Sequence, residues 1–327
     1  MRLTTALLLL ALPAFLAPAP FANAQETPPP PTPPAQPAPE AKPRIYDESA
    51  DARAQIDAAL ARAAKENRRV LVQWGANWCG WCIRLHELFR GDAGIRRTLL
   101  YEYDLVYVDI GQWDKHMDIA ESYGADLKSH GVPFLTILAP DGTVLANQET
   151  GSLEAPEGST PAHDPGKVKS FLDTHKAAPL DARTVLDDAL AKARDEGKSV
   201  FLHFGAPWCG WCHRLEAFIA REDIRAILDP ALVDAKIDID RMTGGQELLD
   251  KLGGAGQGIP WFVFLNAAGD RIATSADSGE NIGYPGDAPS AEAFSDMLAK
   301  LPARIDRDQL RAIRRELVDS MKPKPRE

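Results

Sequence analysis

The sequence predicts an α/β protein with two tandem domains of one architecture, each a central mixed sheet flanked by helices, after a signal peptide and a Pro-rich linker. Two observations support this prediction. Residues 51–89 align with residues 181–219 without a gap, at 19 identities in 39 positions, which indicates an internal duplication. Each copy also contains a full set of helical and strand patterns, so two similar domains fit better than a solenoid of short repeats.

The first 24 residues have the pattern of a secretory signal peptide. A basic start precedes an apolar run that Pro13 interrupts, and this run is shorter than the roughly 20 residues of a membrane helix. We therefore expect a periplasmic or secreted protein with no stable membrane insertion after signal cleavage. Residues 25–47 form the expected disordered linker, because the nine prolines within residues 28–43 favour extended polyproline II.

Charge and cysteine content narrow the classes of function. The chain carries 37 basic and 47 acidic side chains and a formal net charge of −10. Proteins that bind the phosphates of nucleic acids usually carry a positive charge instead. We expect no nucleic-acid partner. Four cysteines in 327 residues are too few for a disulfide-stapled scaffold, and they fall in two close pairs.

Apolar periodicity gives the same order of elements in both copies. We expect domains at residues 48–177 and 178–303, followed by a charged C-terminal helix or tail at 304–327 to which we assign no function. In chain order the expected elements are a helix (52–65; 182–194), a strand (70–74; 200–204), a helix starting at the cysteines, a second strand (105–110; 232–239), a helical patch, a hairpin after Gly-Val-Pro or Gly-Ile-Pro, and a final helix (168–175; 291–301).

Both cysteine pairs lie in the motif Trp-Cys-Gly-Trp-Cys, where a strand passes into a helix. Two cysteines three residues apart in the first turn can close a small disulfide ring and open it again. Unpaired backbone N–H groups and the helix dipole favour a thiolate at the first cysteine, so we expect Cys79 and Cys209 to attack. The second cysteines, Cys82 and Cys212, are expected to resolve the mixed disulfide.

His86 and Glu216 stand four residues beyond the second cysteine, on the same helical face. Either side chain is a candidate for transferring the proton of that thiol. The alternative is a helix residue that simply faces solvent.

Both copies resemble thioredoxin-family domains. The resemblance rests on Trp-Cys-x-x-Cys after the first core strand and on a distant proline, 54 residues after Cys79 and 51 after Cys209. It implies a cis-proline that faces the cysteine pair, a preceding residue whose backbone pairs with an extended substrate, and an exposed tryptophan between the cysteines. The substrate-binding residues that it implies are Val132, Pro133, Ile259, Pro260, Trp81 and Trp211.

The chain departs from the family pattern behind the cysteines. Gln73 and His203 occupy the position where the family usually keeps a buried acid, and Lys236 is matched by Tyr107 in the first copy. His203 and Lys236 are further candidates for proton transfer, although a histidine in an apolar strand is also often a hydrogen-bonded core residue. We therefore expect the chemistry of the two cysteine pairs to differ.

The resulting prediction is a thiol-disulfide oxidoreductase whose partners are client proteins with thiols or disulfides and a membrane or soluble redox partner. No cofactor or metal is implied, and the direction of electron transfer stays open. The rival is a thioredoxin-fold binding module, either a chaperone or a copper carrier, without redox turnover. Less favoured alternatives are a single four-thiolate zinc site and permanently oxidised structural disulfides, which stabilise little across so short a ring.

Overall fold

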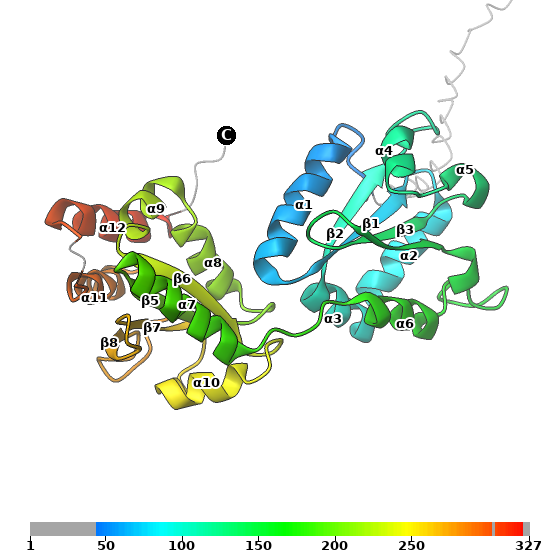
Figure 1. The fold of residues 1–327 in the computed structure, drawn as a ribbon. Helices are drawn as coiled ribbons and strands as arrows, with labels where there is room; N and C mark the ends of the chain where they lie inside the picture. Colours follow the sequence, from blue (N-terminus) through cyan, green and yellow to red (C-terminus); the bar gives the residue numbers. More distant parts are fainter. Residues whose placement is uncertain (1–43, 303–304, 323–327) are drawn as a thin grey trace, which may run out of the picture. The chain divides into compact units, whose positions relative to one another are not determined.

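The computed structural model describes residues 44–302 and 305–322 and contains two four-stranded mixed sheets flanked by helices (Figure 1). The strand orders are β2-β1-β3-β4 and β6-β5-β7-β8. In each sheet the first two strands pair in parallel and the remaining neighbours are antiparallel. The predicted fold class is confirmed. The predicted signal peptide and residues 25–43 of the predicted linker lie outside the described residues.

The elements of the first region follow the predicted order, with one additional helix, α3. They are α1 (Ala52–Glu66), β1 (Arg69–Gly75), α2 (Gly80–Gly91), α3 (Ala93–Glu102), β2 (Tyr103–Asp109), α4 (Met117–Ser122), α5 (Leu127–His130), β3 (Phe134–Leu138), β4 (Val144–Glu149), the 3-10 turn η1 (Gly151–Leu153) and α6 (Pro165–His175).

The second region has the same strand order, has one helix, α10, where the first region has α4 and α5, and adds a helix at its end. Its elements are α7 (Ala182–Glu196), β5 (Ser199–Gly205), α8 (Gly210–Ile219), α9 (Glu222–Leu228), β6 (Leu232–Asp238), α10 (Gly245–Leu252), β7 (Trp261–Leu265), β8 (Arg271–Thr274), α11 (Ala288–Ala299) and α12 (Arg307–Asp319).

The helix α3 is a difference from the sequence prediction, which placed one helix between the cysteines and the second strand. Asp92 ends α2 with an extended backbone, and its side chain accepts a hydrogen bond from the Ile95 backbone N–H at 2.8 Å. A short polar residue in that position caps a new helix, so the chain makes two helices where the apolar pattern indicated one.

Strand β1 is buried on both faces, and its alternation decides which side chains reach the cysteines. Val70, Val72 and Trp74 pack in one cluster with the buried residues of α1. Leu71 packs on the opposite face with residues of α2, α3 and α6. Because side chains alternate along a strand, Gln73 also lies on the α2 face, and it is fully buried there.

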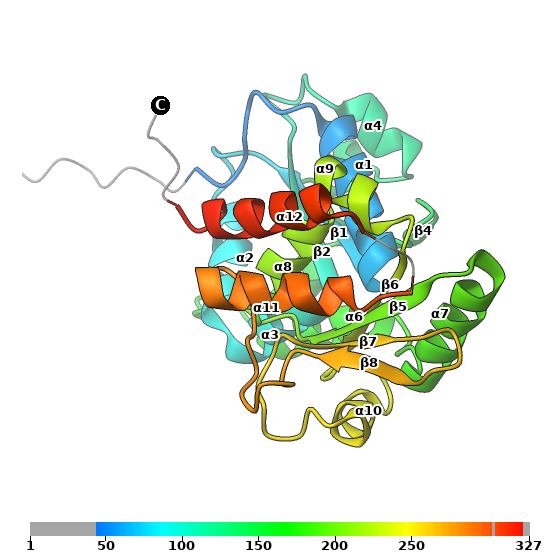
Figure 2. The ribbon, with the colours of Figure 1, turned by 90° about the vertical axis from the view of Figure 1, so that its left-hand side faces the viewer.

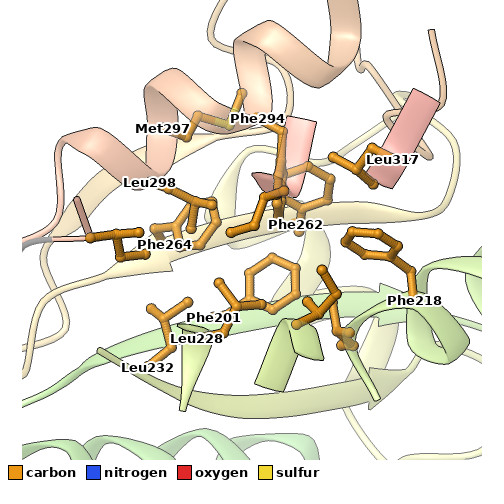
Figure 3. Close-up of a cluster of buried hydrophobic side chains, with 14 of the residues drawn as sticks. Phe201, Phe218, Leu228, Leu232, Phe262, Phe264, Phe294, Met297, Leu298 and Leu317 are labelled. Atoms are coloured by element: carbon orange, nitrogen blue, oxygen red, sulfur yellow. The ribbon is translucent and has the colours of Figure 1, made fainter. Parts of the chain in front are cut away.

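The second sheet is built in the same way. Val200, Leu202 and Phe204 pack with α7, whereas Phe201 belongs to the large aromatic cluster under α8, α9 and α11 (Figure 3). His203 therefore lies on the α8 face, where it is 2% exposed and stacks on Phe201 with ring centroids 5.4 Å apart.

The segment predicted as a charged C-terminal helix or tail contains the helix α12, which packs into this second core. It lies beside α11 (Figure 2), and its Ile313 and Leu317 are fully buried in the cluster of Phe201. Its charged residues occupy the remaining face, where Arg314 Nη1 lies 3.0 Å from Glu292 Oε1 of α11. Among the described residues, no helix combines the length and hydropathy that crossing a bilayer requires.

Candidate active site

Each cysteine pair sits where a buried strand ends and a helix begins, and each pair forms a disulfide with Cα atoms 5.3 Å apart. Cys79 and Cys209 are the N-cap residues of α2 and α8. Their sulfur atoms accept the backbone N–H of Cys82 and Cys212 at 3.1 and 3.2 Å. A helix leaves these first N–H groups without intrahelical partners, so the same N–H will stabilise a thiolate at the first cysteine after reduction.

The residues that precede the two distant prolines lie against the cysteine pairs. The Val132–Pro133 and Ile259–Pro260 peptide bonds are cis. Cys79 Sγ lies 3.6 Å from the carbonyl oxygen of Val132, and Cys209 Sγ lies 3.7 Å from that of Ile259. Segments 53 and 50 residues apart in sequence thus meet at each sulfur.

The tryptophan between the cysteines is exposed in both regions, with 38% exposure for Trp81 and 51% for Trp211. In both regions an arginine guanidinium lies 5.1 Å from a ring centroid of this tryptophan. An aromatic ring from the loop before the last sheet-covering helix also contacts it, at 5.4 Å in the first region and 5.9 Å in the second. The partners are Arg84 and His163 for Trp81, and Arg214 and Tyr284 for Trp211.

Two predicted positions meet behind the first cysteine pair. His86 Nδ1 lies 2.7 Å from the hydroxyl oxygen of Tyr107, and their rings meet edge to face. Burial, with the nearby Arg90 guanidinium, lowers the pKa of His86 below its ordinary value. This pair is therefore a hydrogen bond between neutral groups at neutral pH.

The same two positions form an ion pair in the second region. Lys236 Nζ lies 2.8 Å from Glu216 Oε1. A β-carbon built on Gly205 would lie 3.3 Å from Cys212 Sγ and 3.7 Å from Glu216 Oε1, so the carboxylate and the second sulfur face the same backbone position. A charged pair thus stands where the first region has a neutral one.

His203 has a different partner from the other candidates. Its Nε2 lies 3.1 Å from Asp234 Oδ1 on the neighbouring strand β6. His203 is therefore a buried histidine with a hydrogen-bond partner on the neighbouring strand, and its role in proton transfer stays a prediction.

Tyr46 is a component of the first site that the sequence did not indicate. It lies in the predicted linker, yet its side chain is 2% exposed and packs in one small cluster with Cys79 and Cys82. Gln73 Nε2 donates a hydrogen bond to the Tyr46 hydroxyl oxygen at 2.8 Å. A lone aromatic residue directly after a proline-rich segment gives no periodic signal, so sequence patterns had no means of finding it.

Comparison with known proteins agrees with this geometry. Residues 51–140 and 181–267 match the family model described as thioredoxin-like. The chain is 24% identical over 242 residues to Protein disulfide-isomerase tigA of Aspergillus niger, covering 72% of this chain and 59% of that protein. It is also 24% identical over 230 residues to Protein disulfide isomerase-like 2-2 of Oryza sativa subsp. japonica, covering 67% of this chain and 56% of that protein.

The chain thus spans less than two thirds of the length of these curated relatives. Among solved structures, the disulphide isomerase from Xylella fastidiosa Temecula1 is 25% identical to the chain. That alignment covers 41% of this chain and 98% of the other, at a TM-score of 0.35.

Proposed function

The chain belongs to the thioredoxin-like family, and from this premise we propose that it is a thiol:disulfide oxidoreductase acting on client proteins. One observation carries the proposal. In each region, a Cys-x-x-Cys disulfide at a helix N-terminus has its first sulfur within 3.7 Å of the carbonyl that precedes a cis-proline. This arrangement leaves the first sulfur beside backbone that an extended client segment can pair with.

In the reducing direction, the reduced first region begins with attack of the Cys79 thiolate on one sulfur of a client disulfide. The client S–S bond breaks, one client sulfur leaves as a thiolate that takes up a proton, and a mixed disulfide forms. Cys82 then loses its proton and attacks the Cys79 sulfur. The second client sulfur leaves, the Cys79–Cys82 bond forms, and the two electrons of the cysteine pair have passed to the client.

The second region performs the same steps with Cys209 and Cys212, and reversal of the steps oxidises a client dithiol. A membrane or soluble redox partner resets each pair, and the relative reduction potentials decide the direction. The signal-peptide pattern supports a periplasmic or secreted location, where disulfide chemistry is usual. The duplication supports two catalytic domains at about residues 48–177 and 178–303.

Trapping of the mixed disulfide tests the proposal. Cys82→Ser and Cys212→Ser remove the resolving sulfur, so each variant should accumulate covalent client adducts that a reductant releases. The matched control is Cys79→Ser combined with Cys82→Ser, which lacks the attacking sulfur and should form no adduct in the first region. Absence of adducts on both single variants would refute the proposal, and aggregation suppression without any cysteine would instead support a binding module.

A further inference from the structure

Residues 45–48 form a clip that is fixed to the turn before the first cysteine pair. Asn77, two residues before Cys79, makes four hydrogen bonds to the clip, and Lys115 Nζ donates a further one to the Glu48 carbonyl at 2.8 Å. Asn77 Oδ1 accepts the backbone N–H groups of Ile45 and Tyr46 at 2.9 and 3.0 Å. Asn77 Nδ2 donates to the Tyr46 carbonyl and to Glu48 Oε1, both at 2.9 Å. Four hydrogen bonds from one side chain therefore hold the clip and the cysteine turn together.

The clip places the Tyr46 hydroxyl beside the second cysteine. A β-carbon built on Gly75 would lie 2.3 Å from the Tyr46 hydroxyl oxygen and 2.6 Å from Cys82 Sγ, so both atoms lie over the same backbone position. The hydroxyl oxygen already accepts a hydrogen bond from Gln73 Nε2. A phenol oxygen also carries one donor proton, and a buried donor needs an acceptor. By these two distances (2.3 and 2.6 Å) the hydroxyl oxygen lies within 4.9 Å of Cys82 Sγ, and reduction of the disulfide would make this sulfur available as the acceptor.

The protonation state of Tyr46 suits a donor. Burial raises the pKa of Tyr46 far above its ordinary value, so the phenol keeps its proton at physiological pH. A buried thiolate, in contrast, is costly without a hydrogen-bond donor.

We propose that Tyr46 donates a hydrogen bond to the Cys82 thiolate in the reduced first site, and that Asn77 is the positioning residue that holds Tyr46 there. The inference rests on the proposed oxidoreductase function. When the mixed disulfide is resolved, the Cys82 proton leaves to solvent and its sulfur bonds to Cys79. The bond between Cys79 and the client sulfur breaks at the same time. Tyr46 keeps its own proton and stabilises the attacking thiolate before the new S–S bond forms.

The second region has no equivalent of this arrangement at the aligned positions. Pro207 replaces Asn77 and offers no side-chain hydrogen bonds, and Lys176 stands 130 residues after Tyr46. The Cys209–Cys212 pair is therefore an internal control in the same chain.

The test is the pH dependence of Cys82 alkylation in the reduced full chain, in a Cys79→Ala background that leaves Cys82 as the only thiol of its pair. Tyr46→Phe keeps the ring and removes the hydroxyl. We expect the pKa of Cys82 to rise by about one unit, which lowers the thiolate fraction at neutral pH about tenfold. Asn77→Ala should shift the pKa of Cys82 in the same direction, because it releases the clip.

The matched control is Tyr103→Phe, which removes another buried hydroxyl of the first region, one that donates to the Leu172 carbonyl. This variant should leave the pKa of Cys82 unchanged. An unchanged or lowered pKa in Tyr46→Phe would overturn the inference, as would an equal shift in Tyr103→Phe. The alkylation experiment needs no client, so the two proposals can fail separately. A shift in the pKa of Cys82 without any client trapped on Cys82→Ser or Cys212→Ser would refute the oxidoreductase proposal alone. Client trapping without a shift in the pKa of Cys82 would refute only the role of Tyr46.

Discussion

Replacing Gly75 by alanine tests the packing behind the first cysteine pair. Gly75 and Gly205 are aligned residues that end β1 and β5, so sequence alone predicts one outcome for both. The structure predicts two. A β-carbon on Gly75 meets the Tyr46 hydroxyl oxygen at 2.3 Å and Cys82 Sγ at 2.6 Å. On Gly205 its nearest neighbours are the β-carbon and sulfur of Cys212, at 3.1 and 3.3 Å.

The magnitudes follow from these distances. Carbon atoms in ordinary contact lie about 3.5–4.0 Å apart, so Gly205 needs shifts of a few tenths of an ångström, whereas Gly75 needs shifts of more than 1 Å. Overpacking a well-packed core costs about 1–3 kcal/mol, and alanine recovers about 0.4–1 kcal/mol by restricting the unfolded chain. We expect Gly75→Ala to lower the free energy of unfolding of the first region by about 2 kcal/mol, and Gly205→Ala to change that of the second by less than about 1 kcal/mol.

Native-state hydrogen exchange, followed by mass spectrometry in increasing urea, measures the two regions separately in one chain. The exchange of β1 peptides reports the first region, and that of β5 peptides reports the second. Both variants should be measured with the disulfides intact, so that the sulfur positions are those of the structure. Equal losses at the two glycines would refute the assignment of Tyr46 to the space over Gly75.

Two further predictions concern ionisable side chains. Burial, with a smaller effect of Arg84, lowers the pKa of His163 to about 4, so the folded state resists its protonation. The unfolded chain takes up this proton first as the pH falls through about 6.5, and stability should drop by about 2 kcal/mol between pH 7.5 and 4.5. Urea unfolding at a series of pH values measures this loss, and His163→Phe should remove it. Parallel curves of unfolding free energy against pH for the wild type and His163→Phe would contradict the argument. In the second region, Glu216→His or Lys236→Tyr alone should lower the free energy of unfolding by about 1–2 kcal/mol. Each substitution leaves the remaining member of the Glu216–Lys236 pair charged and half-buried without this partner. The double variant recreates the neutral pair of the first region and should recover most of the loss, as measured by hydrogen exchange of β5; additive losses would show that the two side chains do not interact.

The strands were predictable because they are buried and repeated. Residues 70–74 and 200–204 are apolar runs with little else in them, and the structure extends each by only one residue at either end, to Arg69–Gly75 and Ser199–Gly205. Helix α12 was predictable as a helix, but its place in the core was not. Whether Ile313 and Leu317 face solvent or protein depends on α11 lying beside them, and hydrophobic periodicity within one helix does not specify its neighbour.

The candidate site was predictable in its cysteines and in the prolines that the resemblance placed beside them. The partners behind the cysteines needed the strand register. Register places Gln73 opposite Tyr107 and His203 opposite Lys236, which is why a residue on α2 or α8 meets a side chain from β2 or β6. The sequence indicated His86 and Glu216 without their partners. Only the folded sheet brings Tyr107 into contact with His86 and Lys236 into contact with Glu216.

The two sites are alike at the sulfur atoms and different around them. Both pairs have the same Cα separation and nearly the same contact with the cis-proline loop. The sulfur geometry for thiol–disulfide exchange is therefore equivalent in the two regions.

The polar side chains near the second cysteine differ between the two regions. Cys82 has a neutral phenol donor nearby in Tyr46, whereas Cys212 faces the same backbone position as the Glu216 carboxylate, which Lys236 balances. A neutral donor stabilises a thiolate, while a carboxylate opposes a second negative charge unless it accepts the proton itself. Stabilising the thiolate of the reduced form raises the reduction potential of a dithiol pair. Duplication has thus kept the Trp-Cys-Gly-Trp-Cys motif and changed its surroundings, and on this reasoning the first pair should be the more oxidising of the two.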